Sequence, residues 1–184
     1  MPSASIQQPK PFSIRSLSKL NGFRHDGERY YFKPSFSWSK ITSSTNTFRY
    51  YPEGFCFDSA GLCILGEDEL DFELLGFLNS KVCEKILGIL NPTLNASPGV
   101  IKKLPLTKQY PPIVKNNVLE NISVSKLYWD SNEYSFNHTV NELIRIKGQD
   151  LEETYDLYQQ YWKSKFFQLH KNEEELNRQF IEIY

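Results

Sequence analysis

The spacing of apolar residues changes near residue 66, and this change constrains the fold of the 184-residue chain more than any other feature. Before it, aromatic and β-branched residues occur in short runs separated by turn signals, a pattern typical of antiparallel strands. After it, apolar residues recur at three- and four-residue steps, as on one face of an amphipathic helix. A sheet region followed by helices predicts an α+β fold, in which a small antiparallel sheet packs with helices and a helical tail follows.

Four short runs are predicted to be strands. They cover residues 29–33, 47–51, 55–58 and 62–65. The segments 52–54 and 59–61 each end in glycine and are compact turns, so we expect an antiparallel meander or a small curled sheet. Because side chains alternate along a strand, Phe55 and Phe57 should share one face of this sheet and Cys56 should point to the other.

The helical spacing begins at Glu67. Residues 67–90 are predicted to form one helix, or two helices broken near Asn79 and Ser80, with acids in the first turns where the helix dipole favours negative charge. Residues 98–112 are rich in proline and predict an extended crossing. Further helices are expected over residues 13–20, 113–127, 140–146, 151–169 and 173–184.

The length suits one domain, with or without an appendage, and is sufficient for an independent core. We expect a flexible lead-in at residues 1–11, a first domain over 12–110 and a helical C-terminal region over 111–184. No run approaches the roughly 20 apolar residues that span a bilayer, and residues 1–11 lack the apolar core of a signal peptide. The expectation is therefore a cytoplasmic protein without a membrane partner.

Metal binding is not predicted. Cys56, Cys63 and Cys83 contain no C-x-x-C pair, and the three histidines occur singly. Structural zinc needs four ligands, usually in close pairs. The cysteines are expected to be buried free thiols in a reducing compartment.

Charge is segregated along the chain although the net charge is −1. Residues 1–50 hold eight Lys and Arg against two acids, and residues 51–100 hold two against eight. Residues 101–150 are again basic, with seven against five, and residues 151–184 are acidic, with four against seven. Nucleic-acid binding needs local positive potential opposite the phosphates, so the first and third quarters are candidate contact regions. The alternative is that these cations are solvated surface.

The chain carries no pattern for catalysis. It lacks a glycine-rich turn that would hold S-adenosylmethionine and the [Asn/Asp/Ser]-Pro-Pro-aromatic loop that would hold a flipped adenine. The segment 91–94 reads Asn-Pro-Thr-Leu and is predicted to be a helix-terminating turn instead. Asp130 and Glu133 alone are too few for a nuclease site. No catalytic, cofactor-binding or metal-binding residue is therefore predicted.

DNA reading is the better-supported chemistry. Arg and Asn suit bidentate contacts with guanine and adenine edges, while Ser, Thr and Lys suit phosphates. We predict that the segment 37–50 enters a groove, that Arg49 and Asn46 read bases, and that Lys102 and Lys103 hold the backbone. The candidate DNA-binding residues are Arg24, Trp38, Ser43, Ser44, Asn46, Arg49, Tyr50, Lys102 and Lys103.

Structural roles compete with DNA contact at several of these positions. Trp38 and Phe48 suit packing in a core or strand, and Arg49 suits an internal salt bridge. The aromatic stripe over residues 155–166 has helical spacing and suits the packing of a helix, for example against another domain.

Several sequence blocks, in one order, resemble the C-terminal target-recognition region of BREX-type adenine-specific DNA methyltransferases of the PglX family. The blocks are residues 30–33, 36–41, 48–58, 75–81, 90–94, 125–131 and 172–184. The chain departs from the family pattern at residues 133–138, which read Glu-Tyr-Ser-Phe-Asn-His in place of Glu-Thr-Ser-Trp-Asp-Phe. It also has Ser35 to Ser37 where a glycine usually precedes the Thr-Trp-Ser stretch.

The resemblance implies a specificity part or fragment of such a methyltransferase in phage defence, with residues 12–110 as its target-recognition domain. The methyl donor S-adenosylmethionine would bind to the parent enzyme, so this chain would be inactive alone. Double-stranded DNA, the methyltransferase catalytic domain and other BREX subunits would be its partners. The alternative is an interaction module that docks a defence-system subunit without touching DNA.

Overall fold

A computed structural model describes residues 19, 21, 27–66, 69–107 and 109–184. It divides the chain into two compact units, residues 1–31 and residues 32–184. The first unit contains the 3₁₀ helix η1 (Glu28–Tyr30), in which the Tyr30 N–H donates to the Gly27 carbonyl. The predicted strand over 29–33 is therefore wrong. The predicted lead-in at 1–11, all but residue 19 of the predicted helix at 13–20, and Arg24 lie outside the described residues.

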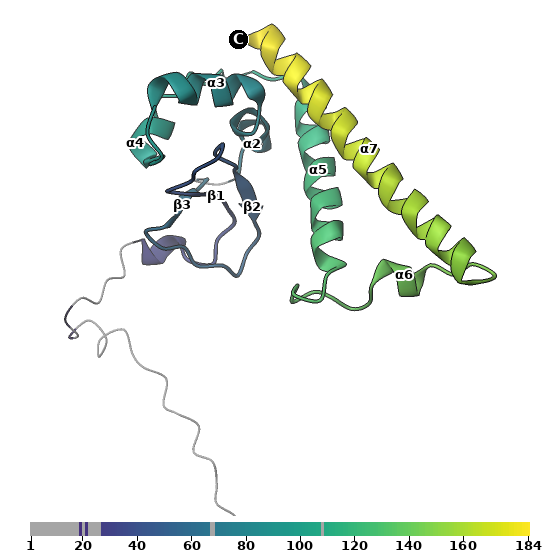
Figure 1. Cartoon of the computed structure of the whole chain (residues 1–184). Coiled ribbons are helices and arrows are strands. Elements are labelled where there is room, and N and C mark those ends of the chain that lie inside the picture. The colour runs from purple at the N-terminus through teal and green to yellow at the C-terminus, as the bar shows by residue number, and fades with distance from the viewer. Residues whose placement is uncertain (1–18, 20, 22–26, 67–68, 108) are drawn as a thin grey trace, which may run out of the picture. The chain divides into compact units, whose positions relative to one another are not determined.

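The second unit begins with a three-stranded antiparallel sheet, as predicted (Figure 1). Its strands are β1 (Ser35–Ser39), β2 (Arg49–Tyr51) and β3 (Gly61–Ile64), in the order β2-β1-β3. The first strand is thus central, which a meander would not give. The predicted strand over 55–58 is wrong, because these residues form a loop in which Cys56 is exposed.

Strand alternation divides the sheet into two faces. In β1, Phe36 and Trp38 are buried, and their neighbours across the sheet include Tyr50 and Leu62. The other face carries Ser35, Ser37 and Ser39 from the same strand. This alternation of serine and aromatic residues explains why one face packs on the helices.

The predicted break at Asn79 and Ser80 is confirmed. Helix α2 (Phe72–Leu78) begins at Asp71, whose carboxylate accepts from the Leu74 N–H, and helix α3 (Lys81–Leu90) begins at Ser80, whose hydroxyl accepts from the Cys83 N–H. Such side-chain caps satisfy N–H groups that lack partners in the first turn. Helix α3 ends at Asn91, whose side-chain amide donates to the Thr93 and Asn95 carbonyls, so the predicted turn at 91–94 is also confirmed.

The remaining helices differ from prediction in extent. They are α4 (Pro98–Ile101), α5 (Pro112–Asp130), α6 (Glu142–Arg145) and α7 (Leu151–Ile183). The segment 98–112 is therefore not extended throughout. The two helices predicted over 151–169 and 173–184 are one helix, because no proline or glycine lies between them and Asn172 bonds to α5 rather than capping a helix end.

One hydrophobic core joins residues from both predicted segments, 12–110 and 111–184. Phe77 of α2 packs edge-on against Phe180 of α7, with ring centroids 5.8 Å apart. Val118 of α5 lies so close to Gly76 that a Cβ built on this glycine would be 2.7 Å from the valine Cγ2. Of the three cysteines only Cys83 is buried, so the prediction of buried thiols holds for that residue alone.

Helix α7 spans 33 residues and has charged and polar residues spread among its apolar ones. None of the helices in the described ranges combines the length and hydrophobicity needed to cross a bilayer.

Candidate nucleic-acid interface

A polar cavity lies between the loop that joins β1 to β2 and the helices α2 and α3. We call it the loop cavity; its volume is about 590 Å³. The loop contributes Thr42, Ser44 and Asn46 to its lining, and the start of α3 contributes Lys81 and Lys85. Two of the sequence-predicted DNA-binding residues, Ser44 and Asn46, therefore line one site.

Hydrogen bonds hold both ends of this loop. At its start, the Thr42 N–H donates to the Leu94 carbonyl at 3.2 Å, and the Ala96 N–H donates to the Lys40 carbonyl at 2.9 Å. At its end, the Asn79 side chain accepts from the Phe48 N–H at 3.0 Å and donates to the Phe48 carbonyl at 2.9 Å. The helix break at Asn79 thus positions the loop that joins β1 to β2.

Between these hydrogen bonds at its two ends, the loop makes few hydrogen bonds of its own. The Ser44 N–H donates to the Thr42 hydroxyl at 3.1 Å, and Ser43, Ser44 and Thr45 are exposed. Asn46 is partly buried, and its Oδ1 atom is buried without a hydrogen-bond partner. A buried unpaired acceptor costs about 1 to 3 kcal/mol, so a rearrangement that supplies a donor would be favourable.

Two lysines give the loop cavity its positive charge. Lys81 pairs with Glu84 at 2.9 Å, which offsets much of its charge. Lys85 is exposed, and no ion pair to it occurs within the described residues. Lys81 lies in the first turn of α3, where the helix dipole adds positive potential, and Lys85 lies one turn further along. An anion such as a phosphate would be attracted here.

The sequence interpretation missed Asn79, Lys81 and Lys85. One signal was available, because Lys81 and Lys85 are the two cations among eight acids in residues 51–100. Their position directly after the helix break at Asn79 would have distinguished them from cations scattered on a surface.

Arg49 lies outside the loop cavity. It is exposed on β2, where it is paired with Ser37 on the serine face of the sheet. Within the described part of the chain no ion pair involves Arg49, so the internal salt bridge considered from the sequence is not observed there. Its guanidinium remains available to an external acceptor.

Trp38 and Tyr50 occupy structural positions instead of a binding surface. Trp38 is 4% exposed, and its indole N–H donates to the Ala96 carbonyl at 2.8 Å. Tyr50 packs its ring against Phe36 and Phe72, with centroids 6.3 and 5.5 Å away. Both side chains lie on the core face of the sheet, where their packing gives them a structural role. Their contact with DNA stays a prediction.

Lys102 and Lys103 follow helix α4 and are exposed. Neither they nor Arg49 line the loop cavity. The candidate set divides into a loop group (Ser43, Ser44 and Asn46) and separate surface cations.

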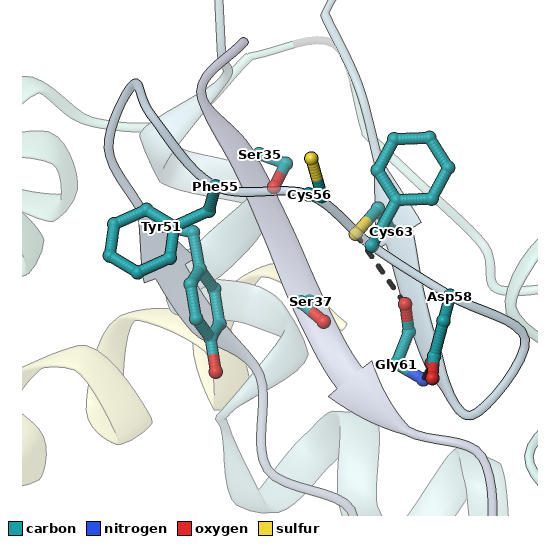
Figure 2. Close-up of a pocket in the computed structure, with 9 residues that line it drawn as sticks. Ser35, Ser37, Tyr51, Phe55, Cys56, Asp58, Gly61 and Cys63 are labelled. Atoms are coloured by element: carbon teal, nitrogen blue, oxygen red, sulfur yellow. Dashed lines mark hydrogen bonds between the residues drawn. The ribbon is translucent and has the colours of Figure 1, made fainter. Parts of the chain in front are cut away.

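A second cavity, of about 310 Å³, lies over the serine face of the sheet (Figure 2). Figure 2 shows Ser35 and Ser37 along β1, with Tyr51 and Cys63 on opposite sides of them. Asp58 at its edge accepts hydrogen bonds from the N–H groups of Gly61 and Ala60, which lower the pKa of its carboxyl group. Asp58 therefore stabilises the turn before β3.

No group of three or more His, Cys, Asp or Glu side chains in the described ranges is arranged to hold a metal ion. The polar groups that line the loop cavity are hydroxyls, amides, two ammonium groups and the Glu84 carboxylate, beside apolar side chains such as Leu87. These donors and acceptors suit recognition of a polyanion and of base edges.

Comparison with known proteins gives the family context. No family model matches the chain. It is 33% identical over 176 residues to the adenine-specific methyltransferase PglX of Lacticaseibacillus casei (strain Zhang), an alignment that covers 92% of this chain and 15% of that protein. It is 31% identical over 161 residues to the adenine-specific methyltransferase BrxX of Escherichia coli O9:H4 (strain HS), covering 83% of this chain and 13% of that protein. The chain thus spans about a seventh of the length of these relatives, and it is homologous to one region of the BREX-type adenine-specific methyltransferases.

Proposed function

We propose that this chain reads DNA sequence as the specificity segment of an adenine-specific methyltransferase, while methyl transfer occurs on another part of the enzyme. The supporting observation is the loop cavity, in which an exposed polar loop clamped at both ends faces the cationic start of a helix. A rigid frame with an adaptable loop suits base recognition, since loops on a scaffold can adjust to a ligand.

The loop residues have distinct proposed roles. The Asn46 amide offers one donor and one acceptor, which match the N7 and N6 groups of adenine. Ser43, Ser44 and Lys85 would contact phosphates, and so would Lys102 and Lys103 where the duplex extends to them. Arg49 would read guanine from the exposed face of β2.

The catalytic domain of the methyltransferase would bind S-adenosylmethionine and act on the adenine. This chain would then depend on double-stranded DNA and on that domain as partners, with other BREX subunits as further contacts. A DNA-reading role also requires the cytoplasmic location expected from the sequence.

Salt-dependent binding tests the proposal. Duplexes selected by the chain from a random-sequence pool are compared with unselected duplex by fluorescence anisotropy. We expect binding to weaken linearly on a plot of log affinity against log salt. Lys85→Ala should reduce that slope by about 0.9 for one lost phosphate contact and weaken all sequences alike. Lys171→Ala, an exposed cation on α7, is the control.

Loss of sequence preference is the more specific readout. Asn46→Ala and Arg49→Ala should each reduce the preference for selected over unselected duplex by about 1 to 3 kcal/mol. Equal losses on both duplexes would remove the residue concerned from base reading. Failure of the random pool to yield any enriched sequence, with the chain folded, would refute the proposed function.

A second candidate is a protein-docking module that does not contact DNA. Exposed aromatic side chains near the junction of α5, α6 and α7 favour it, among them Tyr128, Trp129 and Phe136, which are 59%, 54% and 105% exposed. Salt separates the two, because an apolar interface responds weakly to ionic strength.

A further inference from the structure

Helix α7 carries an apolar face along its first half that the described residues leave uncovered. Leu151, Tyr155 and Phe166 are 79%, 50% and 59% exposed. In the second half, by contrast, Leu176 and Phe180 are buried against the rest of the unit. Figure 1 shows α7 running beside α5 and continuing to α6. The first half of α7 therefore has a face suited to a further partner.

The spacing of this face reads the same in both directions. We define the α7 seam as Leu151, Tyr155, Gln159, Trp162, Phe166 and His170. Successive members are 4, 4, 3, 4 and 4 residues apart. These steps keep the seam within about 100° of arc on a helix with 3.6 residues per turn. Its midpoint falls between Gln160 and Tyr161.

A palindromic seam fits a second copy of the same helix running in the opposite direction. With the midpoints aligned, Tyr155 lies opposite Phe166 of the second copy, and Gln159 lies opposite Trp162 of the second copy. Each contact then occurs twice, as a two-fold symmetric interface requires. A parallel arrangement would instead place each seam residue beside its own equivalent.

The charges beside the seam favour the same antiparallel arrangement. One flank carries Glu152 and Asp156 in its first part and Lys163 in its second part. Antiparallel pairing brings this flank against the same flank of the second copy, with Asp156 near its Lys163, whereas parallel pairing would turn the flank toward the opposite side of the second copy's seam. Within the described ranges, neither Asp156 nor Lys163 takes part in an ion pair. His170 lies 3.5 Å from Glu174 of its own helix.

We propose that the chain forms an antiparallel, two-fold symmetric dimer through the α7 seam. The interface is independent of the loop cavity and of the DNA-reading function. A helix segment of this length, about 30 Å, buries less surface than most permanent dimers, so the association is concentration-dependent. The hydrogen bonds from Asn172 to α5 lie beyond the seam and remain intact in the dimer, and Trp162 keeps its edge contact with Tyr128 of α5, at 5.4 Å between ring centroids.

Sedimentation equilibrium of the whole chain over a range of concentrations tests the dimer. The expected result is an average mass that rises toward twice that of the monomer. Phe166→Ala should weaken association by about tenfold or more, because the ring is removed from both copies. Phe167→Ala is the matched control: its ring is 56% exposed, close to the 59% of Phe166, but lies off the seam. Circular dichroism confirms that each variant is folded.

Charge reversal tests the direction of pairing. Asp156→Lys and Lys163→Asp should each weaken the dimer about tenfold, since each creates two like-charge contacts. The double variant should regain most of the affinity. A monomer at all concentrations, as expected if the face docks a different protein, overturns the proposal. So does a double variant that binds no tighter than the single variants.

Discussion

Asn79 is the residue whose substitution should reveal how the loop between β1 and β2 is held. Its side chain makes two hydrogen bonds to the backbone of Phe48 and a third to the Leu75 carbonyl, at 3.1 Å. Phe48 is 4% exposed and its ring packs 5.6 Å from that of Trp38. Asn79→Ala therefore leaves an N–H and a carbonyl of a buried residue without partners.

The expected loss follows from those two backbone groups. Leaving a buried donor or acceptor unpaired costs about 1 to 3 kcal/mol. The Asn79 residue is exposed, so water reaches part of the site and the lower half of the range applies to each group. We therefore expect Asn79→Ala to lower the free energy of unfolding by about 2 to 4 kcal/mol.

Asn91→Ala is the matched control. The Asn91 side chain also makes three hydrogen bonds, to the Thr93 carbonyl, the Asn95 carbonyl and the Thr93 hydroxyl. Because Thr93 and Asn95 are exposed, water replaces the lost partners. The expected loss is about 1 kcal/mol or less.

Asn79→Asp separates the roles of the two amide atoms. It keeps the acceptor for the Phe48 N–H but places a carboxylate oxygen against the Phe48 and Leu75 carbonyls. This variant should be at least as unstable as Asn79→Ala at neutral pH. Relative to wild type at the same pH, the deficit should shrink near pH 4, where the carboxyl gains a proton to donate.

Urea unfolding followed by circular dichroism measures these differences, provided that the slope against denaturant is unchanged. An Asn79→Ala loss no larger than that of Asn91→Ala would refute the reasoning. A fully stable Asn79→Asp at pH 7 would show that the two carbonyl contacts do not matter.

The remaining predictions concern two helix glycines and two of the cysteines. Gly76→Ala should lower the free energy of unfolding by about 1 to 3 kcal/mol, because its Cβ would meet Val118 at 2.7 Å, and adding Val118→Ala should recover part of the loss in a denaturant titration. Gly88→Ala in α3 should instead raise the free energy of unfolding by about 0.5 to 1 kcal/mol, since no heavy atom lies within 4 Å of the added Cβ. Destabilisation by this change would contradict the open space beside Gly88. Burial raises the pKa of the Cys83 thiol from 9.0 to about 12. Exposed Cys56 should therefore react first with a thiol reagent at neutral pH, and equal rates would contradict the buried position of Cys83. Above pH 9 the Cys83 thiol ionises in the unfolded chain but not in the folded one, so its contribution to stability falls up to about pH 12, and Cys83→Ala should remove that part of the decline.

The helices were predictable where local chemistry marks their ends. Asp71 and Ser80 cap α2 and α3, and a cap acts within one turn, so neighbouring sequence is sufficient to locate it. The continuity of α7 was not predictable in this way. Asn172 reads as a helix breaker in isolation, but it bonds across to Glu120 and Asn121 of α5, which are far away in sequence.

The central strand β1 carries a sequence signal that the strand prediction overlooked. Ser35 to Ser39 alternates serine with Phe36 and Trp38, which is the period-two signal of a half-buried strand. Strands were predicted instead at residues 29–33 and 55–58, on the basis of their aromatic residues. Those runs form a 3₁₀ turn and a loop because tertiary pairing, not aromatic content, decides which segments join the sheet.

The placement of the candidate DNA contacts follows the same division between local and distant causes. The loop position of Ser43, Ser44 and Asn46 was predictable from composition, because runs of polar residues usually form exposed loops. The core positions of Trp38 and Tyr50 were harder to predict, because aromatic side chains serve a core and a base stack equally well and strand alternation is needed to separate the two uses.

The clamps and the loop they hold should therefore respond differently to substitution. Asn79, Leu94 and Ala96 fix the ends of the loop through bonds to backbone atoms, so the identity of the exposed residues 43–45 contributes little to the fold. On the proposed function, exchanging those residues should alter the preferred DNA sequence while leaving the free energy of unfolding within about 0.5 kcal/mol. Exchanging Asn79 should do the reverse, reducing stability and binding to every sequence together. A scaffold of this kind allows the sequence that is read to change without requiring the protein to find a new fold.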